Sequence, residues 1–256
     1  MDRWFLIAAT LLAAVAGIRG LLVLRGGKKS RWTSSWMIAV FGCQVGYLVL
    51  RGEMRGACPL QSFAEISVYL AWSLTLFYLI IGPAYRISLL GVFTAPVVVL
   101  FQGFALLPGR LAANPVRVIE TNPWGETHSA MSVLAYGALA LAAVAGVMFL
   151  VLDHQLKEHH LKGGLFRNLP PVRELLVSLE RLLWVGLALL TVGIIAGILM
   201  PHETDEAWKH VFVALGVWGC YVAMMVVKRV RGITGRKYAL GAVALFLVSL
   251  GVFAFV

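Results

Sequence analysis

Residues 122–160 read NPWGETHSAMSVLAYGALALAAVAGVMFLVLDHQLKEHH. A polar segment leads to His128, and an uncharged apolar run follows from Met131 to Leu152. A helix over this run is long enough to cross a bilayer whose hydrocarbon core is about 30 Å thick. A second polar segment begins at Asp153. Because ionisable groups stand at both ends of this helix, the rest of the chain is best understood by asking which polar groups lie level with His128.

The composition of the whole chain predicts a membrane protein. Of its 256 residues, 60% are hydrophobic and 13% are charged, whereas about a quarter of the residues of a soluble domain are charged. Apolar runs of membrane length recur along the chain, which predicts an all-α, polytopic bundle that crosses a lipid bilayer as one domain over residues 1–256. The predicted spans are approximately 4–24, 35–50, 63–82, 87–107, 129–152, 182–200, 208–227 and 238–256. The first is interpreted as a retained span rather than a leader, and the short second span is expected to extend into flanking polar residues.

The distribution of Lys and Arg predicts the orientation of these spans. Fifteen of these residues fall in alternate connecting segments, and only six fall in the segments between them. Cytoplasmic loops of membrane proteins carry an excess of positive charge. The richer segments are therefore predicted to lie inside, and both termini and His128 are predicted to lie outside.

Three loops are predicted to form most of the outer surface. They read RGEMRGACPLQS, PGRLAANPVRVIETNPWGETH and PHETDEAWKH. Three prolines are expected to break helix in the second loop, with a short interfacial helix near Val116–Glu120 as an option. Trp124 and Trp208 suit the headgroup level of a bilayer.

Packing inside the bundle is predicted from small residues at four-residue spacing, which let helix backbones approach closely. The clearest cases are Ala13 with Gly17, Ala138 with Ala142 and Gly146, and Gly193 with Gly197. On the inner side, Val172–Leu183 is predicted to form an amphipathic helix that leads into the sixth span, beside basic residues that match an anionic leaflet.

Three histidines are predicted to lie on the outer side, namely His128, His202 and His210. A neutral imidazole at a membrane boundary is a good axial ligand for haem iron or for another transition metal. Two such groups on different helices would face one another across a flat macrocycle, and Trp124 and Trp208 would supply aromatic surface beside it. The alternative is that these histidines bond only to water and headgroups. His128 ranks first as a ligand because it begins a helix rich in small residues, and His210 ranks before His202.

Two groups of charges have simple structural interpretations. The charged residues and histidines from Asp153 to His160 form a dense inner cluster, interpreted as a solvated helix end with an Asp153–Lys157 pair, and alternatively as a relay or docking site. A carboxylate at Glu65, near the start of the third span, needs water, a cation or a partner. The expected partner is Arg51 or Arg55.

Several functions are disfavoured by the sequence. The formal net charge of +10 is explained by membrane topology, so nucleic-acid binding is not expected. Cys43, Cys58 and Cys220 form no CxxC, CxxCH or zinc pattern, so neither a disulfide framework nor thiol chemistry is expected. The sequence contains no GxSxG, P-loop or HExxH. An enzyme with a side-chain nucleophile is therefore not expected.

Four passages of the chain resemble one family. They read GACPLQSFAEISVYLAWSLTLFYL, ETHSAMSVLAYGALALAAVAGVMFLVLDHQLKEHHLK, LERLLWVGLALLTVGIIAGILM and WKHVFVALGVWGCYVAMMVVKRVRGITGRKYAL. In this order and spacing they are similar to the cytochrome c assembly proteins of the CcsA, CcmC and ResC type, and most of all to the short HemX-like and YpjD-like members. The resemblance runs from about the second span to the eighth.

The resemblance implies a protein that handles haem at the outer face of the bacterial cytoplasmic membrane and assists c-type cytochrome assembly, as a haem chaperone or assembly factor. The family's outer histidine corresponds to His128, where it is taken to ligate haem iron. Some members carry a tryptophan-rich loop and a second outer histidine near the C-terminus, where this chain has PHETDEAWKH and SLGVFAFV. The second ligand is therefore expected from His210 or His202. An apocytochrome, alone or with a partner protein, would contribute the cysteine thiols.

Two other functions stay open. A HemX-like regulator would control a soluble enzyme of tetrapyrrole synthesis through the inner cluster around His154–Lys162. Its deletion would change haem precursor levels and leave cytochrome c intact. A small-molecule permease is disfavoured because no span is expected to carry paired breaks or buried charges.

Overall fold

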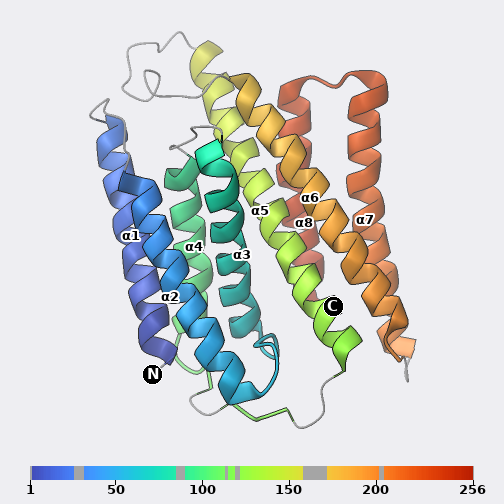
Figure 1. Ribbon diagram of the computed structural model, residues 1–256. Coiled ribbons are helices and arrows are strands. Elements are labelled where there is room, and N and C mark those ends of the chain that lie inside the picture. Colours follow the sequence, from blue (N-terminus) through green and yellow to red (C-terminus); the bar gives the residue numbers. More distant parts are fainter. Residues whose placement is uncertain are drawn as a thin grey trace. The chain divides into compact units, whose positions relative to one another are not determined.

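The computed structural model describes residues 2–25, 32–84, 90–112, 115–118, 122–157, 172–201 and 205–255. Within these ranges the chain forms eight α-helices and no β-strand (Figure 1). The helices are α1 (Asp2–Arg25), α2 (Trp32–Arg55), α3 (Phe63–Ala84), α4 (Leu90–Leu106), α5 (Pro123–Lys157), α6 (Val172–Leu199), α7 (Asp205–Arg231) and α8 (Gly235–Phe255). Each predicted span corresponds to one helix, so the all-α prediction is confirmed.

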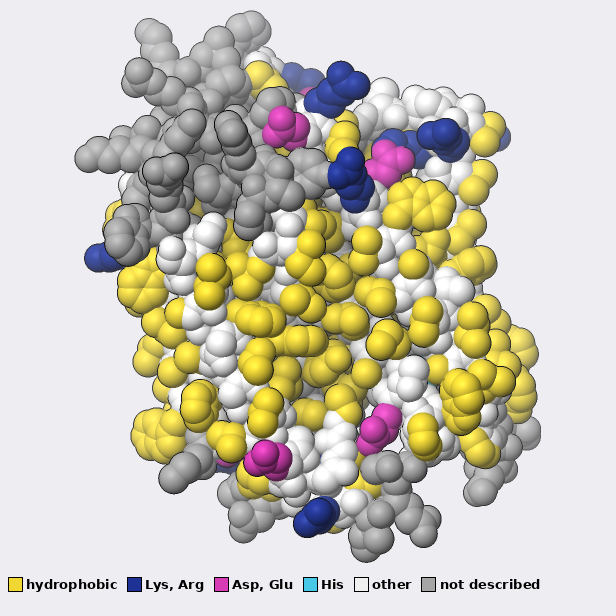
Figure 2. Space-filling model, viewed as in Figure 1, with side chains coloured by type: hydrophobic (Ala, Val, Ile, Leu, Met, Phe, Trp, Pro, Cys, Tyr) yellow, Lys and Arg dark blue, Asp and Glu magenta, His cyan; other side chains and the backbone are white. Residues whose placement is uncertain are grey.

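The helices have the length and composition of membrane spans. Six of them, α1, α2, α3, α5, α6 and α7, are long and apolar enough to cross a membrane, and α4 is a shorter apolar helix. On the face shown in Figure 2, hydrophobic side chains cover the middle of the described residues, whereas most charged side chains lie toward the ends. The protein is a multi-pass helical membrane protein.

The chain divides into two compact units. Unit 1 comprises Met1–Glu120 and Gln155–Glu174, and unit 2 comprises Thr121–His154 and Leu175–Val256. The prediction of one transmembrane domain over residues 1–256 concerns both units together, and it stays a prediction.

In unit 1, the helices α1 to α4 form a four-helix bundle. α1 packs against α2 and α4, and α3 closes the ring by packing against the same two helices. Glycines bring α1 and α4 together: a Cβ atom on Gly20 would lie 2.5 Å from Cγ2 of Val92, and one on Gly17 would lie 3.4 Å from Cβ of Ala95. Gly17, which is predicted to permit close approach in the first span, therefore lies against α4, and so does Gly20, which is not among the predicted residues.

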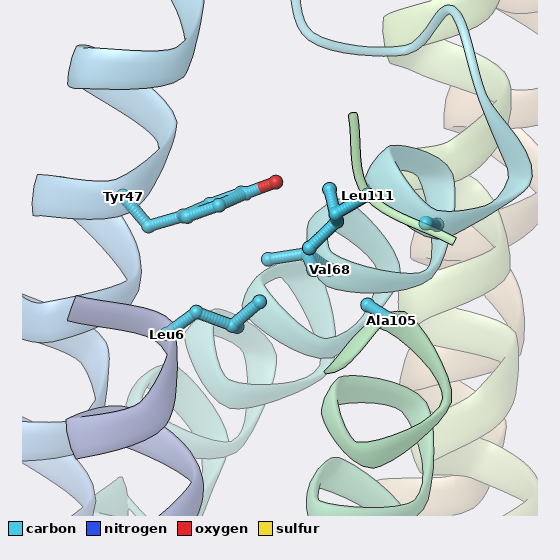
Figure 3. Close-up of a cluster of buried hydrophobic side chains, with 6 residues drawn as sticks. Leu6, Tyr47, Val68, Ala105 and Leu111 are labelled. Atoms are coloured by element: carbon cyan, nitrogen blue, oxygen red, sulfur yellow. The ribbon is translucent and has the colours of Figure 1, made fainter. Parts of the chain in front are cut away.

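The core at one end of unit 1 takes side chains from all four helices (Figure 3). Its buried members are Leu6, Tyr47, Ala64, Val68, Ala105 and Leu111. The Tyr47 ring extends from α2 toward Val68 and Leu111 (Figure 3). These contacts place Leu6, Tyr47, Val68 and Ala105 at one level of the bundle.

In unit 2, α5 is the most buried helix, and it packs against both α6 and α8. A Cβ atom on Gly146 would lie 3.2 Å from the carbonyl oxygen of Ala239 in α8 and 3.4 Å from Cδ1 of Leu179 in α6. The indole Nε1 of Trp218 in α7 donates to Oγ1 of Thr191 in α6 at 2.9 Å. The small residues of the fifth span thus serve close packing, as predicted.

The start of α5 differs from the prediction. The helix begins at Pro123, before the predicted start of the span at residue 129. Proline suits the first helical position because the N–H that it lacks would have no partner there. The side-chain Oδ1 of Asn122 accepts the N–H of Trp124 at 3.0 Å, and its carbonyl oxygen accepts the N–H of Glu126 at 3.0 Å. This cap extends α5 past His128.

The optional interfacial helix near Val116–Glu120 is not formed over the described residues 115–118. The N–H of Val118 donates to the carbonyl oxygen of Arg55 at 2.8 Å, and Nη1 of Arg55 donates to the carbonyl oxygen of Val116 at 3.1 Å. These backbone groups are bonded to α2 rather than to a helical turn of their own. By contrast, α2 extends to Arg55 and α6 begins at Val172, as predicted.

Candidate functional site

His128 lies in the second turn of α5 and faces α6. Its Nδ1 lies 2.7 Å from the carbonyl oxygen of Gly193. The ring also rests on Gly197, because a Cβ atom there would lie 2.7 Å from Nδ1 and 3.0 Å from Cε1. Only a residue without a side chain at position 197 leaves this space for an imidazole.

His128 lies within a continuous packing interface between α5 and α6. Glycines of one helix contact residues of the other in the pairs Gly197 with His128, Gly193 with Ser132, and Gly186 with Leu139. Gly125 in α5 contacts Met200, which directly follows α6. The pairs run in opposite directions along the two helices, so the helices are antiparallel here. Ala135, Leu190 and Ile194 form a buried cluster in the same contact. The imidazole is therefore held between two helices rather than on a free surface.

The bond to Gly193 determines which nitrogen of His128 can bind a metal. A carbonyl oxygen only accepts hydrogen bonds, so Nδ1 carries the hydrogen in this contact. In the neutral ring, Nε2 then has the free lone pair. Histidines that bind metals usually donate their other N–H to a carbonyl or carboxylate in this way, which fixes the tautomer and the orientation of the ring. The residues present at His128 fit an axial ligand for haem iron.

The glycine contact leads to a prediction about stability. We expect Gly197→Ala to lower the free energy of unfolding by about 1–3 kcal/mol, because the added Cβ atom overlaps the imidazole. Gly216→Ala in α7 is the matched control, since no described atom lies within 4 Å of its Cβ position. In the control, alanine is expected to raise the helix stability by up to about 1 kcal/mol. Thermal unfolding of both variants in the same detergent measures the difference, and equal melting temperatures would contradict the packing of His128.

The structure does not bring all the predicted site residues together. Trp124 lies in the first turn of the same helix as His128 and is 48% exposed. Trp208 in α7 is 43% exposed, with its ring 6.4 Å from that of Phe212. His210 lies in the second turn of α7, but its side chain is outside the described residues, as is the whole of His202. The two tryptophans thus present aromatic surface at helix ends, and the identity of a second ligand stays a prediction.

No group of three or more His, Cys, Asp or Glu side chains among the described residues could hold a metal ion. A haem differs from a bare ion because the porphyrin supplies four ligands and the protein supplies one or two. Cys43, Cys58 and Cys220 take part in no disulfide.

A buried ion cluster lies at the end of unit 1 that carries the start of α1. Glu65 is fully buried, and its Oε1 accepts from Nε of Arg51 at 2.8 Å and from Nη2 of Arg55 at 2.9 Å. Its Oε2 accepts the N–H of Gln61 at 3.1 Å. Nη1 of Arg51 also pairs with Asp2 at 3.1 Å. The prediction that Glu65 pairs with an arginine is confirmed, with both arginines as partners.

The same arginines hold the segment that follows α4. Nη1 of Arg51 donates to the carbonyl oxygen of Ala112 at 2.9 Å, Arg55 donates to that of Val116, and Arg3 donates to that of Leu111. The expectation that no span carries buried charges is therefore wrong, since Arg51 lies within α2 with 1% of its surface exposed. Sequence reasoning missed Asp2 and Arg3 as partners, although their predicted outer position at the start of the first span was a signal.

The inner cluster is described only in part. His154 and Lys157 are exposed at the end of α5, whereas residues 158–171 lie outside the described residues. Asp153 lies 4.0 Å from Nε of Arg236 in α8, and Nζ of Lys228 lies 2.6 Å from Oε2 of Glu180. This end of unit 2 carries ion pairs between helices at the surface.

The relationship of the chain to known proteins agrees with these features. Residues 60–255 match the family model described as "Cytochrome C assembly protein", which covers well over half of the chain. The chain is 27% identical over 230 residues to the cytochrome c biogenesis protein CcsA of Prochlorococcus marinus (strain MIT 9301), covering 79% of this chain and 74% of that protein. It is 29% identical over 242 residues to CcsA of Synechococcus sp. (strain CC9311), covering 80% and 77%. It is 25% identical over 271 residues to CcsA of Gloeobacter violaceus (strain ATCC 29082 / PCC 7421), covering 81% and 79%. The family model matches α3 to α8, and each of the three relatives matches about four fifths of the chain. The chain therefore belongs to the cytochrome c assembly protein family.

Proposed function

We propose that this protein binds haem at the outer face of a bacterial cytoplasmic membrane and assists the assembly of c-type cytochromes. The observation that carries the proposal is the bond from Nδ1 of His128 to the carbonyl oxygen of Gly193, which leaves Nε2 as the metal-binding nitrogen. Membership of the cytochrome c assembly family and the names of the relatives support haem as the cargo.

Each residue of the site has a distinct task in this proposal. His128 binds the iron through Nε2, and Gly193 holds the imidazole in the required tautomer. Gly197 leaves the space in which the ring lies. Trp124 and Trp208 offer exposed aromatic faces to the apolar edge of the tetrapyrrole. His210 on α7 is the preferred second ligand, ahead of His202.

The thiols for haem attachment come from another protein in this proposal. Cys43 and Cys220 lie within α2 and α7, and Cys58 lies in the segment after α2. None of the three shares an element with His128. The protein therefore presents haem to an apocytochrome, which brings its own cysteines and is held by a partner protein.

The proposal is tested in a strain that lacks this protein. We expect wild-type protein and His154→Ala to restore c-type cytochromes, measured by haem staining of membrane proteins, whereas His128→Ala fails to restore them at equal protein abundance. His154 is a matched control because it is an exposed histidine at the opposite end of the same helix. Restoration by His128→Ala would contradict the proposal.

The same strains discriminate the regulatory function. Haem precursors are measured alongside the cytochromes in each strain. If deletion changes precursor levels but leaves c-type cytochromes intact, and if His154→Ala rather than His128→Ala reproduces this change, the protein is a regulator that acts through its inner end. We expect the opposite pattern.

A further inference from the structure

Unit 1 contains buried polar side chains that neither the haem site nor the ion cluster uses. Gln44 in α2 and Gln102 in α4 are both fully buried. Neither amide atom of Gln44 has a hydrogen-bond partner among the described residues, and Nε2 of Gln102 also has none. An unpaired polar group destabilises a protein when it is buried. Two such glutamines inside a membrane bundle therefore indicate a bound molecule that forms hydrogen bonds to them.

The two glutamines lie at the same level of the bundle. Oγ1 of Thr10 in α1 bonds to Oε1 of Gln102 at 3.2 Å, so these two residues are side by side. Thr10 lies one turn beyond Leu6 in α1, and Gln102 lies one turn before Ala105 in α4. Gln44 lies one turn before Tyr47 in α2. Because Leu6, Ala105 and Tyr47 share one core layer, the glutamines and Thr10 form the next layer of the bundle.

The polar feature continues from this layer toward the ion cluster. Tyr47 is fully buried, and its hydroxyl group has no hydrogen-bond partner among the described residues. This hydroxyl points into the core beside Val68 and Leu111 (Figure 3). One turn further along α2, Nη2 of Arg51 is also buried and unpartnered. Gln44, Tyr47 and Arg51 thus place unpaired polar atoms along one buried face of α2.

The chemistry of these atoms limits which kind of molecule can bind to them. The glutamine layer carries amide and hydroxyl groups, which both donate and accept, and it carries no formal charge. Among the described residues, this layer has no carboxylate to balance a cation and no basic group to balance an anion. Water suits such a site, because a buried water molecule typically makes about three hydrogen bonds to otherwise unsatisfied polar groups.

We propose that unit 1 contains an internal water-binding site between Gln44, Gln102 and Tyr47, which continues to Arg51 at the predicted outer end. The bound molecules satisfy both amide groups and the phenol. They hydrate the interior of the bundle from its outer end to the glutamine layer. The site is separate from His128, which belongs to unit 2, and the proposal does not depend on haem binding.

Hydroxyl-radical footprinting tests the proposal in the intact, purified protein. Short X-ray exposure generates radicals from water, and mass spectrometry measures the oxidation rate of each tyrosine. We expect Tyr47 to be oxidised several-fold faster than Tyr78. Tyr78 is the matched control because it is equally buried in unit 1, but its hydroxyl bonds to Oγ of Ser34 at 3.4 Å. Oxidation of Tyr47 at or below the rate of Tyr78 would overturn the proposal.

A double substitution, Gln44→Leu with Gln102→Leu, gives the second measurement. Leucine has a similar volume and removes the groups that hold the water, so the oxidation rate of Tyr47 should fall several-fold, to that of Tyr78. The control is Thr75→Val, which removes a buried hydroxyl that bonds only within α3, to the carbonyl oxygen of Ala71. An unchanged rate at Tyr47 in a folded double variant would refute the site. Should the double variant not fold, the comparison of Tyr47 with Tyr78 in the wild type still decides.

Discussion

His128→Ala should abolish the haem-dependent absorbance spectrum of the purified protein. The substitution removes an imidazole whose tautomer is set by a backbone carbonyl, that of Gly193. Losing an outer-shell partner alone weakens metal binding by about 10–100-fold, so losing the ligand itself should lower the affinity for haem by more than about 100-fold. Haem titration followed by absorbance measures this loss. His154→Ala, at the other end of α5, should titrate like the wild type.

Added imidazole distinguishes a lost ligand from a disturbed fold. In His128→Gly, free imidazole should enter the space left by the side chain and restore much of the spectrum, whereas a misfolded variant would not respond. The same titration of His210→Ala and His202→Ala assigns the second ligand, and we expect the larger spectral change in His210→Ala. A spectrum that is unchanged in His128→Ala would remove this residue from the site.

Glu65→Ala should strongly destabilise the protein. Glu65 is fully buried and accepts from both Arg51 and Arg55. Without the carboxylate, two guanidinium groups remain buried close together, and Arg51 keeps its pair with Asp2. Breaking a buried ion pair by removing one partner costs about 3–5 kcal/mol. That is a large part of a typical folding stability of about 5–15 kcal/mol.

Thermal unfolding in detergent, followed by size-exclusion chromatography, measures the effect of Glu65→Ala. Glu53→Ala is the matched control, because Glu53 carries the same charge near the same end of α2 but is exposed. An exposed carboxylate contributes at most about 1 kcal/mol through ion pairs, so this variant should melt close to the wild type. Equal melting temperatures for the two variants would show that the buried cluster does not support unit 1.

The fold could be predicted from the sequence because its main signals are local. An apolar run of membrane length predicts a helix wherever it packs, so every predicted span has its helix. The errors lie at the ends of elements. The sequence predicts a break in helix at Pro123, whereas the Asn122 cap makes it the first residue of α5. The segment 115–118 forms no helix because Arg55 bonds to it.

The ion cluster shows how far pairing can be inferred from a linear pattern. A carboxylate at Glu65 needs a cation as a partner. Arg51 and Arg55 are the expected partners because they are predicted to lie at the same level of the membrane. The other bonds of Arg51 could not be inferred from this linear pattern. Arg51 also bonds to Asp2 and to the carbonyl oxygen of Ala112. Both bonds form because α1, α2 and the segment after α4 meet at one point. Every residue has a backbone carbonyl, so the sequence does not show which carbonyl oxygens bond to the arginines. The attachment of the segment after α4 could therefore not be predicted.

By itself, the sequence determined that this protein is an all-helical, multi-pass membrane protein of the cytochrome c assembly family, and it selected His128 as the leading candidate ligand. The tertiary structure decided which nitrogen of that histidine is free, because the carbonyl of Gly193 stands 65 residues away in the chain. It also decided that Gln44 and Gln102 share one buried layer. Helix length and charge depend on neighbouring residues, whereas these contacts depend on which faces of distant helices meet.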